Sequence, residues 1–142
     1  MTEASPHALE AGIKALSRRD LSRAELVARL QRSGIDTEDA ELACTQLTHA
    51  GYQSDDRAAN ERVRVLAARL QGDRAIRADL RRRGLSEVVI DSALEGIAPE
   101  LERAEALARR AREPAQLARA LHRKGYTEDT IEDALRTSGR QE

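Results

Sequence analysis

The sequence predicts an all-α protein built from three tandem three-helix repeats. Three observations indicate this fold class. A helix-glycine-helix pattern occurs three times, and its closing glycines are Gly34, Gly84 and Gly125. The 142 residues are rich in Ala, Leu, Arg and Glu and include only three Pro, a composition that favours helix. No stretch alternates apolar and polar residues as a half-buried strand would.

The first repeat is predicted over residues 1–51. Its first helix follows Ser5 in the favoured cap-then-proline order. Its second helix follows Ser22, and Glu25 three residues later completes the signature of a capping box. Its third helix follows Asp36, a residue type that commonly caps a helix N-terminus.

The second repeat is predicted over residues 52–98. Ser54 is expected to cap a longer lead helix that ends at Gly72. Asp73 can cap the next helix, which ends at Gly84 because glycine most easily takes the left-handed conformation. Ser86 then caps the last helix of this repeat.

The third repeat is predicted over residues 99–142. Pro99 and Pro114 each open a helix, and Thr127 caps the ninth and last one. Across the three repeats, the residues expected to close or cap the glycine-linked helices are Gly34, Gly84, Gly125, Ser22, Ser86 and Thr127.

The charges follow the same repeat, because the middle helix of each group is basic and the following helix is acidic. The helix dipole explains much of this, since cations at a C-terminus and anions at an N-terminus each gain roughly 0.3–1 kcal/mol. It does not require three consecutive arginines before Gly84. We therefore expect the basic helices to form a partner-binding face. The candidate residues are Arg77, Arg81, Arg82, Arg83, Arg119, Arg123 and Lys124.

The chain has few of the features that catalysis, metal binding or membrane insertion requires. The formal net charge is −1, and no apolar run approaches the roughly 20 residues of a membrane helix. A single cysteine, Cys44, fits a reducing compartment. His7, His49 and His122 lack a second ligand at metal-binding spacing. We expect a cytoplasmic protein without enzymatic activity, cofactor or metal.

Three segments carry a resemblance to a known family. They are GYQSDDRAA at 51–59, IRADLRRRGLS at 76–86 and HRKGYTEDTIEDAL at 122–135. In these segments the chain resembles RecX, the small bacterial regulators of the RecA recombinase. RecX proteins similarly carry Gly-Tyr, an acidic pair and Arg, followed later by a helix of the form Ile-Arg-x-x-Leu-x-x-x-Gly. At Ala58 and Arg62 the chain departs from the family, whose members commonly have aromatic residues there.

The resemblance implies an elongated, curved array that binds RecA and its nucleoprotein filament and inhibits recombinase activity. It implies no catalysis and no cofactor. We expect a monomer whose candidate arginines engage the filament, with weak contact to DNA as a secondary interaction. Two other interpretations stay open, namely a DNA-binding helical module and a general protein-binding helical-repeat scaffold. The acidic second helix of each glycine-linked pair argues against the DNA-binding module, because phosphates would repel it.

Overall fold

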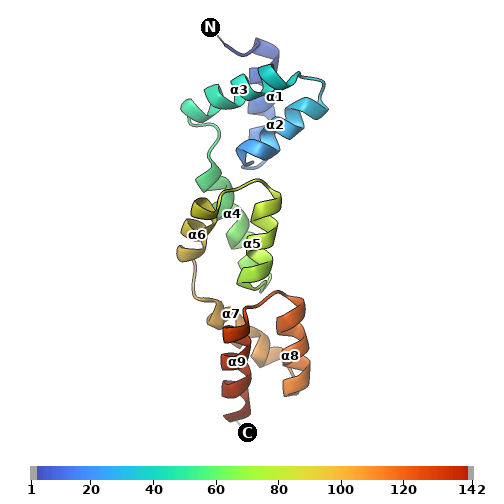
Figure 1. Ribbon diagram of the computed structural model, residues 1–142, viewed down its shortest axis with the longest axis vertical. Coiled ribbons are helices and arrows are strands. Elements are labelled where there is room, and N and C mark those ends of the chain that lie inside the picture. Colours follow the sequence, from blue (N-terminus) through green and yellow to red (C-terminus); the bar gives the residue numbers. More distant parts are fainter. Residues whose placement is uncertain (1–2, 141–142) are drawn as a thin grey trace.

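The computed structural model describes residues 3–140, which contain nine α-helices and no strand. Their bounds are α1 Pro6–Leu16, α2 Arg23–Arg32, α3 Thr37–His49, α4 Asp55–Ala68, α5 Asp73–Arg82, α6 Glu87–Glu95, α7 Glu100–Arg110, α8 Pro114–Arg123 and α9 Glu128–Arg140. Figure 1 shows three groups of three helices placed one after another along the long axis, with the chain ends at opposite ends of the molecule. The predicted fold class, an all-α helical-repeat array, is confirmed.

Each group of three helices packs around its own hydrophobic core, and we call the groups the first, second and third units. The first core gathers residues of α1, α2 and α3, the second those of α4, α5 and α6, and the third those of α7, α8 and α9. Leu, Ile, Val and Ala supply nearly all of the buried surface, as the shortage of aromatics requires. The repeat boundaries proposed from the sequence stay a prediction.

Most of the predicted caps and closing glycines have the expected geometry. The Ser22 hydroxyl accepts a hydrogen bond from the backbone N–H of Glu25, and the backbone N–H of Ser22 donates to the Glu25 carboxylate, which completes the capping box. Ser86 caps α6 by accepting from the backbone N–H of Val89 at 3.3 Å. The closing glycines all have positive φ, with values of 93°, 80° and 78° at Gly34, Gly84 and Gly125. These positions favour glycine because a Cβ is strained there.

Two expectations about the start of α5 are wrong. Gly72 does not end α4, because its φ is −83° and it is the N-cap of α5. The chain instead leaves α4 through Leu70, whose φ is 61°. Asp73 makes no side-chain cap and instead forms an ion pair with Arg103. The cause is contact between units, since a Cβ on Gly72 would lie 2.5 Å from the carbonyl oxygen of Gly125.

The two tyrosines, which follow Gly51 and Gly125, have different environments. Tyr126 is 1% exposed, and its hydroxyl donates to the carbonyl oxygen of Leu70 at 2.8 Å. Tyr52 is 50% exposed and contributes little to a core. Gln53, the residue after it, is buried instead and donates to the carbonyl oxygen of Leu21 at 3.2 Å. At this position the chain buries an amide that links two units rather than an aromatic ring.

Successive units join through the ends of their middle helices, α2, α5 and α8. At the first junction, the Ser22 hydroxyl at the start of α2 donates to the carbonyl oxygen of Arg83 at the end of α5, at 2.5 Å. At the second, the N–H groups of Gly72 and Arg74 at the start of α5 donate to the carbonyl oxygens of Lys124 and Gly125, both at 2.9 Å. Orphan groups of one helix end thus bond to the next helix. We call the resulting stack of α8, α5 and α2 the basic column.

Replacing Gly84 by Val is expected to destabilise the protein more than replacing Gly34 by Val. Both substitutions put a β-branched residue at positive φ, which costs roughly 1–2 kcal/mol. Only at Gly84 would the new Cβ also clash with Ala24 of the first unit, adding roughly 1–3 kcal/mol, whereas the space beside Gly34 is open. Urea midpoints followed by circular dichroism measure the difference. Equal losses of stability in the two variants would show that the end of α5 does not pack tightly against the start of α2.

Candidate partner-binding surface

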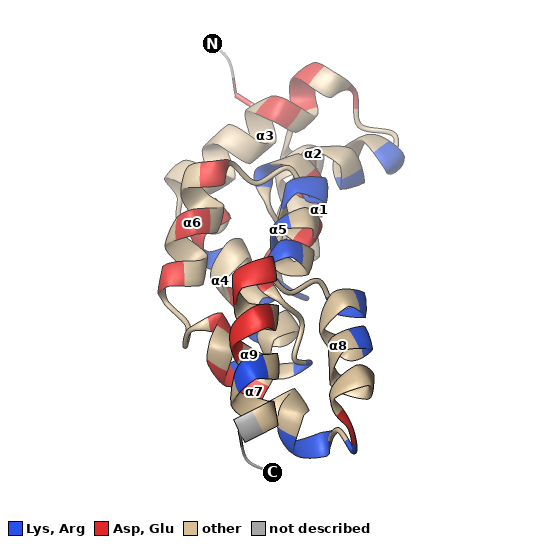
Figure 2. Ribbon diagram, turned by 60° about the horizontal axis from the view of Figure 1, so that its bottom comes forward, with Lys and Arg blue, Asp and Glu red and all other residues tan. Residues whose placement is uncertain are grey.

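The charged side chains are sorted onto two parallel rows of helices. Figure 2 shows Lys and Arg concentrated on α2, α5 and α8, and Asp and Glu concentrated on α3, α6 and α9. Because the three middle helices stack end to end, cations that are far apart in the sequence lie along one continuous column. The repeat of basic middle helices in the sequence becomes one extended positive surface on a protein whose formal net charge is −1.

Part of the positive charge of α5 is neutralised by α6, its acidic neighbour. The guanidinium of Arg81 donates to both carboxylate oxygens of Glu87, each at 2.8 Å. This bidentate bond raises the pKa of Arg81 and lowers the pKa of Glu87. Arg77 donates to Asp91 at 2.7 Å. Two of the candidate arginines therefore hold the glycine-linked helices together as well as facing solvent.

Arg83 lies at the junction of the first and second units rather than on an open surface. Its side chain is 22% exposed and contacts Glu25 of α2 at 2.9 Å and Asp79 of α5 at 2.7 Å. Asp79 also receives two bonds from Arg62, at 3.0 and 3.1 Å. Burial alone would raise the pKa of Asp79, but these arginine hydrogen bonds outweigh it and lower the pKa. Sequence reasoning treated Arg83 as surface because Glu25 is 58 residues away.

The remaining candidates differ in how freely they can meet a partner. Within the described residues, no carboxylate lies within 4.0 Å of Arg119 or Arg123. Arg82 is 71% exposed, with Asp79 at 3.6 Å. Lys124 donates to the carbonyl oxygen of Arg69 at 3.1 Å. Arg82, Arg119 and Arg123 are therefore the most available of the seven.

Two further cations of the column, Arg29 and Arg32 on α2, were left out of the candidate set although the sequence marks α2 as basic. Neither has a carboxylate within 4.0 Å among residues 3–140. Their position one turn apart at the end of α2 was a readable signal. The three consecutive arginines before Gly84 drew attention away from Arg29 and Arg32. The number of arginines in a row does not show whether carboxylates of other helices already bind them.

A second polar network joins the second and third units. Glu100, 8% exposed, accepts hydrogen bonds from the backbone N–H of Asp73 at 2.6 Å and from the hydroxyl of Thr127 at 2.6 Å. Burial would raise the pKa of Glu100, but these and neighbouring hydrogen bonds lower it. Arg103 donates to the carbonyl oxygens of Gln71 and Ala98 and pairs with Asp73. Thr127, for which the sequence predicts a cap of α9, ties the start of its helix to α7, and its role as a cap stays a prediction.

Acid is expected to weaken the second unit and its junction with the first. Because folding lowers the pKa of Asp79, the unfolded chain binds this proton at higher pH than the folded chain. The stabilisation is therefore complete above the unfolded value of about 3.9 and is lost as pH falls through the folded value. Urea midpoints measured from neutral pH to about pH 3 should fall less steeply for Asp79→Asn than for the parent protein. Parallel curves for the two proteins would contradict this origin of the acid sensitivity.

The described residues contain no group of three or more His, Cys, Asp or Glu that could hold a metal ion. Cys44 is fully buried, and burial raises the pKa of its thiol to about 11, which keeps the thiol protonated at neutral pH. None of the described helices is both long enough and apolar enough to cross a membrane.

Comparison with known proteins places these features in a family context. Residues 54–94 match the family described as RecX, second three-helix domain. The chain is 38% identical over 142 residues to the regulatory protein RecX of Chromohalobacter salexigens, covering 94% of this chain and 92% of the relative. It is 35% identical to the regulatory protein RecX of Acidithiobacillus ferrooxidans, covering 87% and 85%.

Solved structures give the same picture. A crystal structure of regulatory protein RecX superposes with a TM-score of 0.78 at 26% identity, covering 90% of this chain and 71% of that one. The crystal structure of RecX from Lactobacillus salivarius has a TM-score of 0.80 at 20% identity, covering 94% and 95%, and supports the fold alone.

Proposed function

The chain belongs to the RecX family of regulatory proteins, and from this premise we propose that it binds the RecA recombinase and its nucleoprotein filament and restrains recombinase activity. The basic column is the single observation that carries the proposal beyond the family name. Its three helices have ten residues each, so end to end they span roughly 45 Å at 1.5 Å per residue. A surface of that length suits an extended partner better than a small ligand.

The physical basis of binding is electrostatic complementarity. A RecA filament combines DNA phosphates with acidic protein surface, and an extended row of arginines would be steered toward both. Arginine also suits the task because its planar guanidinium can bind carboxylate or phosphate through two parallel hydrogen bonds. The acidic helices α3, α6 and α9 would face away from the filament. Contact with DNA is a secondary part of the same proposal.

The mode of action that we propose is binding without chemistry, by a cytoplasmic monomer. The relatives are named as regulatory proteins, and the fold is an array of helical units with three separate cores. A regulator of this kind works by occupying the filament surface. Strand exchange and filament growth would then fall in proportion to the bound fraction, with no turnover of any substrate.

A gel-shift experiment with two substrates tests the proposal. We expect the protein to retard RecA-coated single-stranded DNA at concentrations that leave bare single-stranded DNA unshifted. Raising the salt should weaken the shift, because exposed charges are screened within roughly 10 Å at 0.1 M. Equal retardation of bare DNA would favour the DNA-binding module. Retardation of neither substrate would favour a scaffold for some other protein.

A further inference from the structure

The lead helices of the units share one burial register. In α1 the buried positions are Ala8, Gly12 and Ala15, and in α4 the matching positions are Ala59, Val63 and Leu66, spaced by four and then three residues in both. The middle helices are matched by their closing glycines, Gly34 and Gly84. Counting along these two registers, Ala11 of the first unit corresponds to Arg62 of the second, and Arg29 corresponds to Asp79.

In the second unit an ion pair closes the groove between the lead and middle helices. Arg62 of α4 donates to both carboxylate oxygens of Asp79 on α5, at 3.0 and 3.1 Å. The first unit has neither partner, because Ala11 stands at the position of the arginine and Arg29 at the position of the aspartate. The small side chain leaves space, and the arginine has no internal carboxylate to bind. The groove between α1 and α2 is therefore open.

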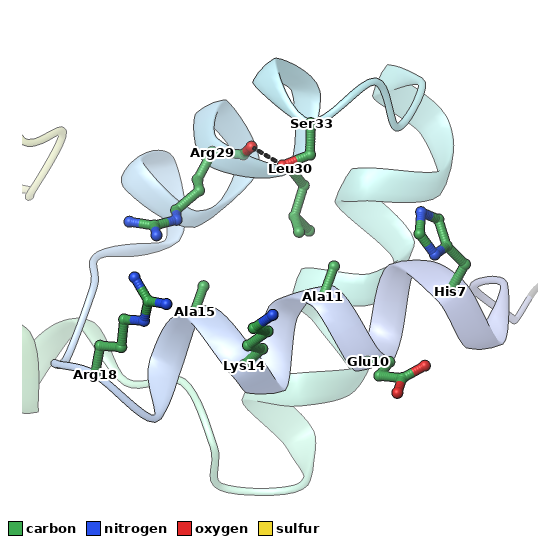
Figure 3. Close-up of a pocket in the computed structure, with 9 residues that line it drawn as sticks. All are labelled: His7, Glu10, Ala11, Lys14, Ala15, Arg18, Arg29, Leu30 and Ser33. Atoms are coloured by element: carbon green, nitrogen blue, oxygen red, sulfur yellow. Dashed lines mark hydrogen bonds between the residues drawn. The ribbon is translucent and has the colours of Figure 1, made fainter.

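The open groove is a pocket of about 490 Å³. Its lining consists of His7, Glu10, Ala11, Lys14, Ala15, Arg18, Arg29, Leu30 and Ser33. Figure 3 shows Arg18, in the turn that follows α1, and Arg29 of α2 reaching toward the same end of the gap from opposite sides. In the described part of the chain, neither guanidinium nor the Lys14 ammonium lies within 4.0 Å of a carboxylate.

We propose that this pocket, the α1–α2 cleft, binds a carboxylate side chain from an acidic and partly aliphatic segment of a partner protein. The bound carboxylate would meet Arg18 and Arg29, much as Asp79 meets Arg62 and Arg83 in the second unit. Ala15 and Leu30 supply an apolar floor for a neighbouring aliphatic side chain.

The same features favour a peptide over a nucleic acid. A polyphosphate would gain nothing from the apolar floor formed by Ala15 and Leu30. A peptide can place its carboxylates at the arginine end and an aliphatic side chain over Ala15. The inference does not depend on RecA, because the chemistry of the cleft alone identifies the ligand class.

The test uses the full chain and a labelled peptide composed of Glu and Leu. Titration into the ¹⁵N-labelled protein should shift the backbone resonances of α1 and α2, centred on Ala15 and Leu30. A peptide with Gln in place of Glu should bind at least about tenfold more weakly, since the charge-assisted bonds are lost. Oligothymidylate at the same concentration should shift the Ala15 and Leu30 resonances less than the peptide does. Absence of peptide binding at millimolar concentration, or shifts confined to other helices, would overturn the proposal.

A closing variant changes the shape of the cleft, and a matched control accounts for the one positive charge that this variant loses. Ala11→Arg combined with Arg29→Asp recreates in the first unit the ion pair of the second, so the fold should be retained while peptide binding falls at least about tenfold. The matched control is Arg64→Gln on α4, an exposed arginine that pairs with Glu61 away from the cleft. This control should change the affinity less than about twofold. Full binding by a folded closing variant would show that the peptide lies elsewhere.

Discussion

Replacing Arg32, Arg119 and Arg123 together by Glu is expected to weaken binding to RecA-coated single-stranded DNA at least about a hundredfold. The change lowers the charge of the column by six units and places repulsive carboxylates on both of its outer helices, α2 and α8. A hundredfold is about 2.7 kcal/mol, or under 1 kcal/mol per arginine, which is ordinary for partly solvated ion pairs. Fluorescence anisotropy of the labelled filament at constant salt measures the loss.

The matched control carries the same total charge change on arginines outside the column. Arg64 and Arg136 are exposed and pair only with neighbours on their own helices, and Arg109 is exposed on α7. Replacing these three by Glu should leave most of the affinity. Both triple variants should keep their helical signal, because surface substitutions usually change stability by about 0.5 kcal/mol or less each. Equal binding by the two variants would mean that net charge, and not the column, governs the interaction.

Arg83 is left out of that variant for a structural reason. A glutamate at this position would stand between Glu25 and Asp79, both of which now bind the guanidinium. Reversing Arg81, Arg82 and Arg83 together, the experiment that the sequence first suggests, would therefore disturb the junction between the first two units. A loss of binding could then come from altered unit geometry as much as from lost contact.

Arg103→Met is expected to destabilise the protein by roughly 3–5 kcal/mol. Arg103 is 6% exposed, and its guanidinium satisfies the carbonyl oxygens of Gln71 and Ala98 and the carboxylate of Asp73. Methionine fills a similar volume but donates no hydrogen bond, so two carbonyls and a carboxylate would lose their partner.

Urea unfolding followed by circular dichroism provides the measurement for Arg103→Met. Arg109→Met on the same helix is the control, because Arg109 is exposed and its replacement should change stability by about 0.5 kcal/mol or less. Because the units have separate cores, the second and third units of the Arg103→Met variant should unfold at a lower urea concentration than its first unit. A midpoint within error of the control would show that the buried arginine is dispensable.

Sequence reasoning succeeded where the controlling interaction is local. The cap at Ser22 and the positive φ of Gly84 depend on residues within one or two turns, and both were predictable. It failed where the partner is remote. Gly72 was expected to end a helix, yet its small size serves contact with Gly125, 53 residues later in the chain. The pattern shows that a glycine is present, but not which neighbouring backbone requires it.

In the candidate surface, too, local features were predictable from the sequence and contacts with remote residues were not. The charge alternation between middle and following helices predicted a basic face, and Figure 2 shows these helices aligned. The sequence could not predict which arginines are free to bind a partner protein. Arg81, Arg82 and Arg83 are consecutive, yet each lies near a carboxylate of a different residue. Burial of Glu100 was equally hidden, since a charged residue in a helix first turn normally faces solvent and its hydrogen-bond donors lie 27 residues away.

The end-to-end stacking of the middle helices also limits how the units could be shuffled by recombination. The first junction uses a side-chain hydroxyl on Ser22, whereas the second uses the bare backbone of Gly72 pressed against Gly125. If a copy of the first unit stood directly before the third unit, Ser22 would occupy the position of Gly72. Its Cβ would then clash with the backbone of Gly125. The three units look alike as folds, yet each carries the complement of one particular neighbour, so their order is encoded in the contacts themselves.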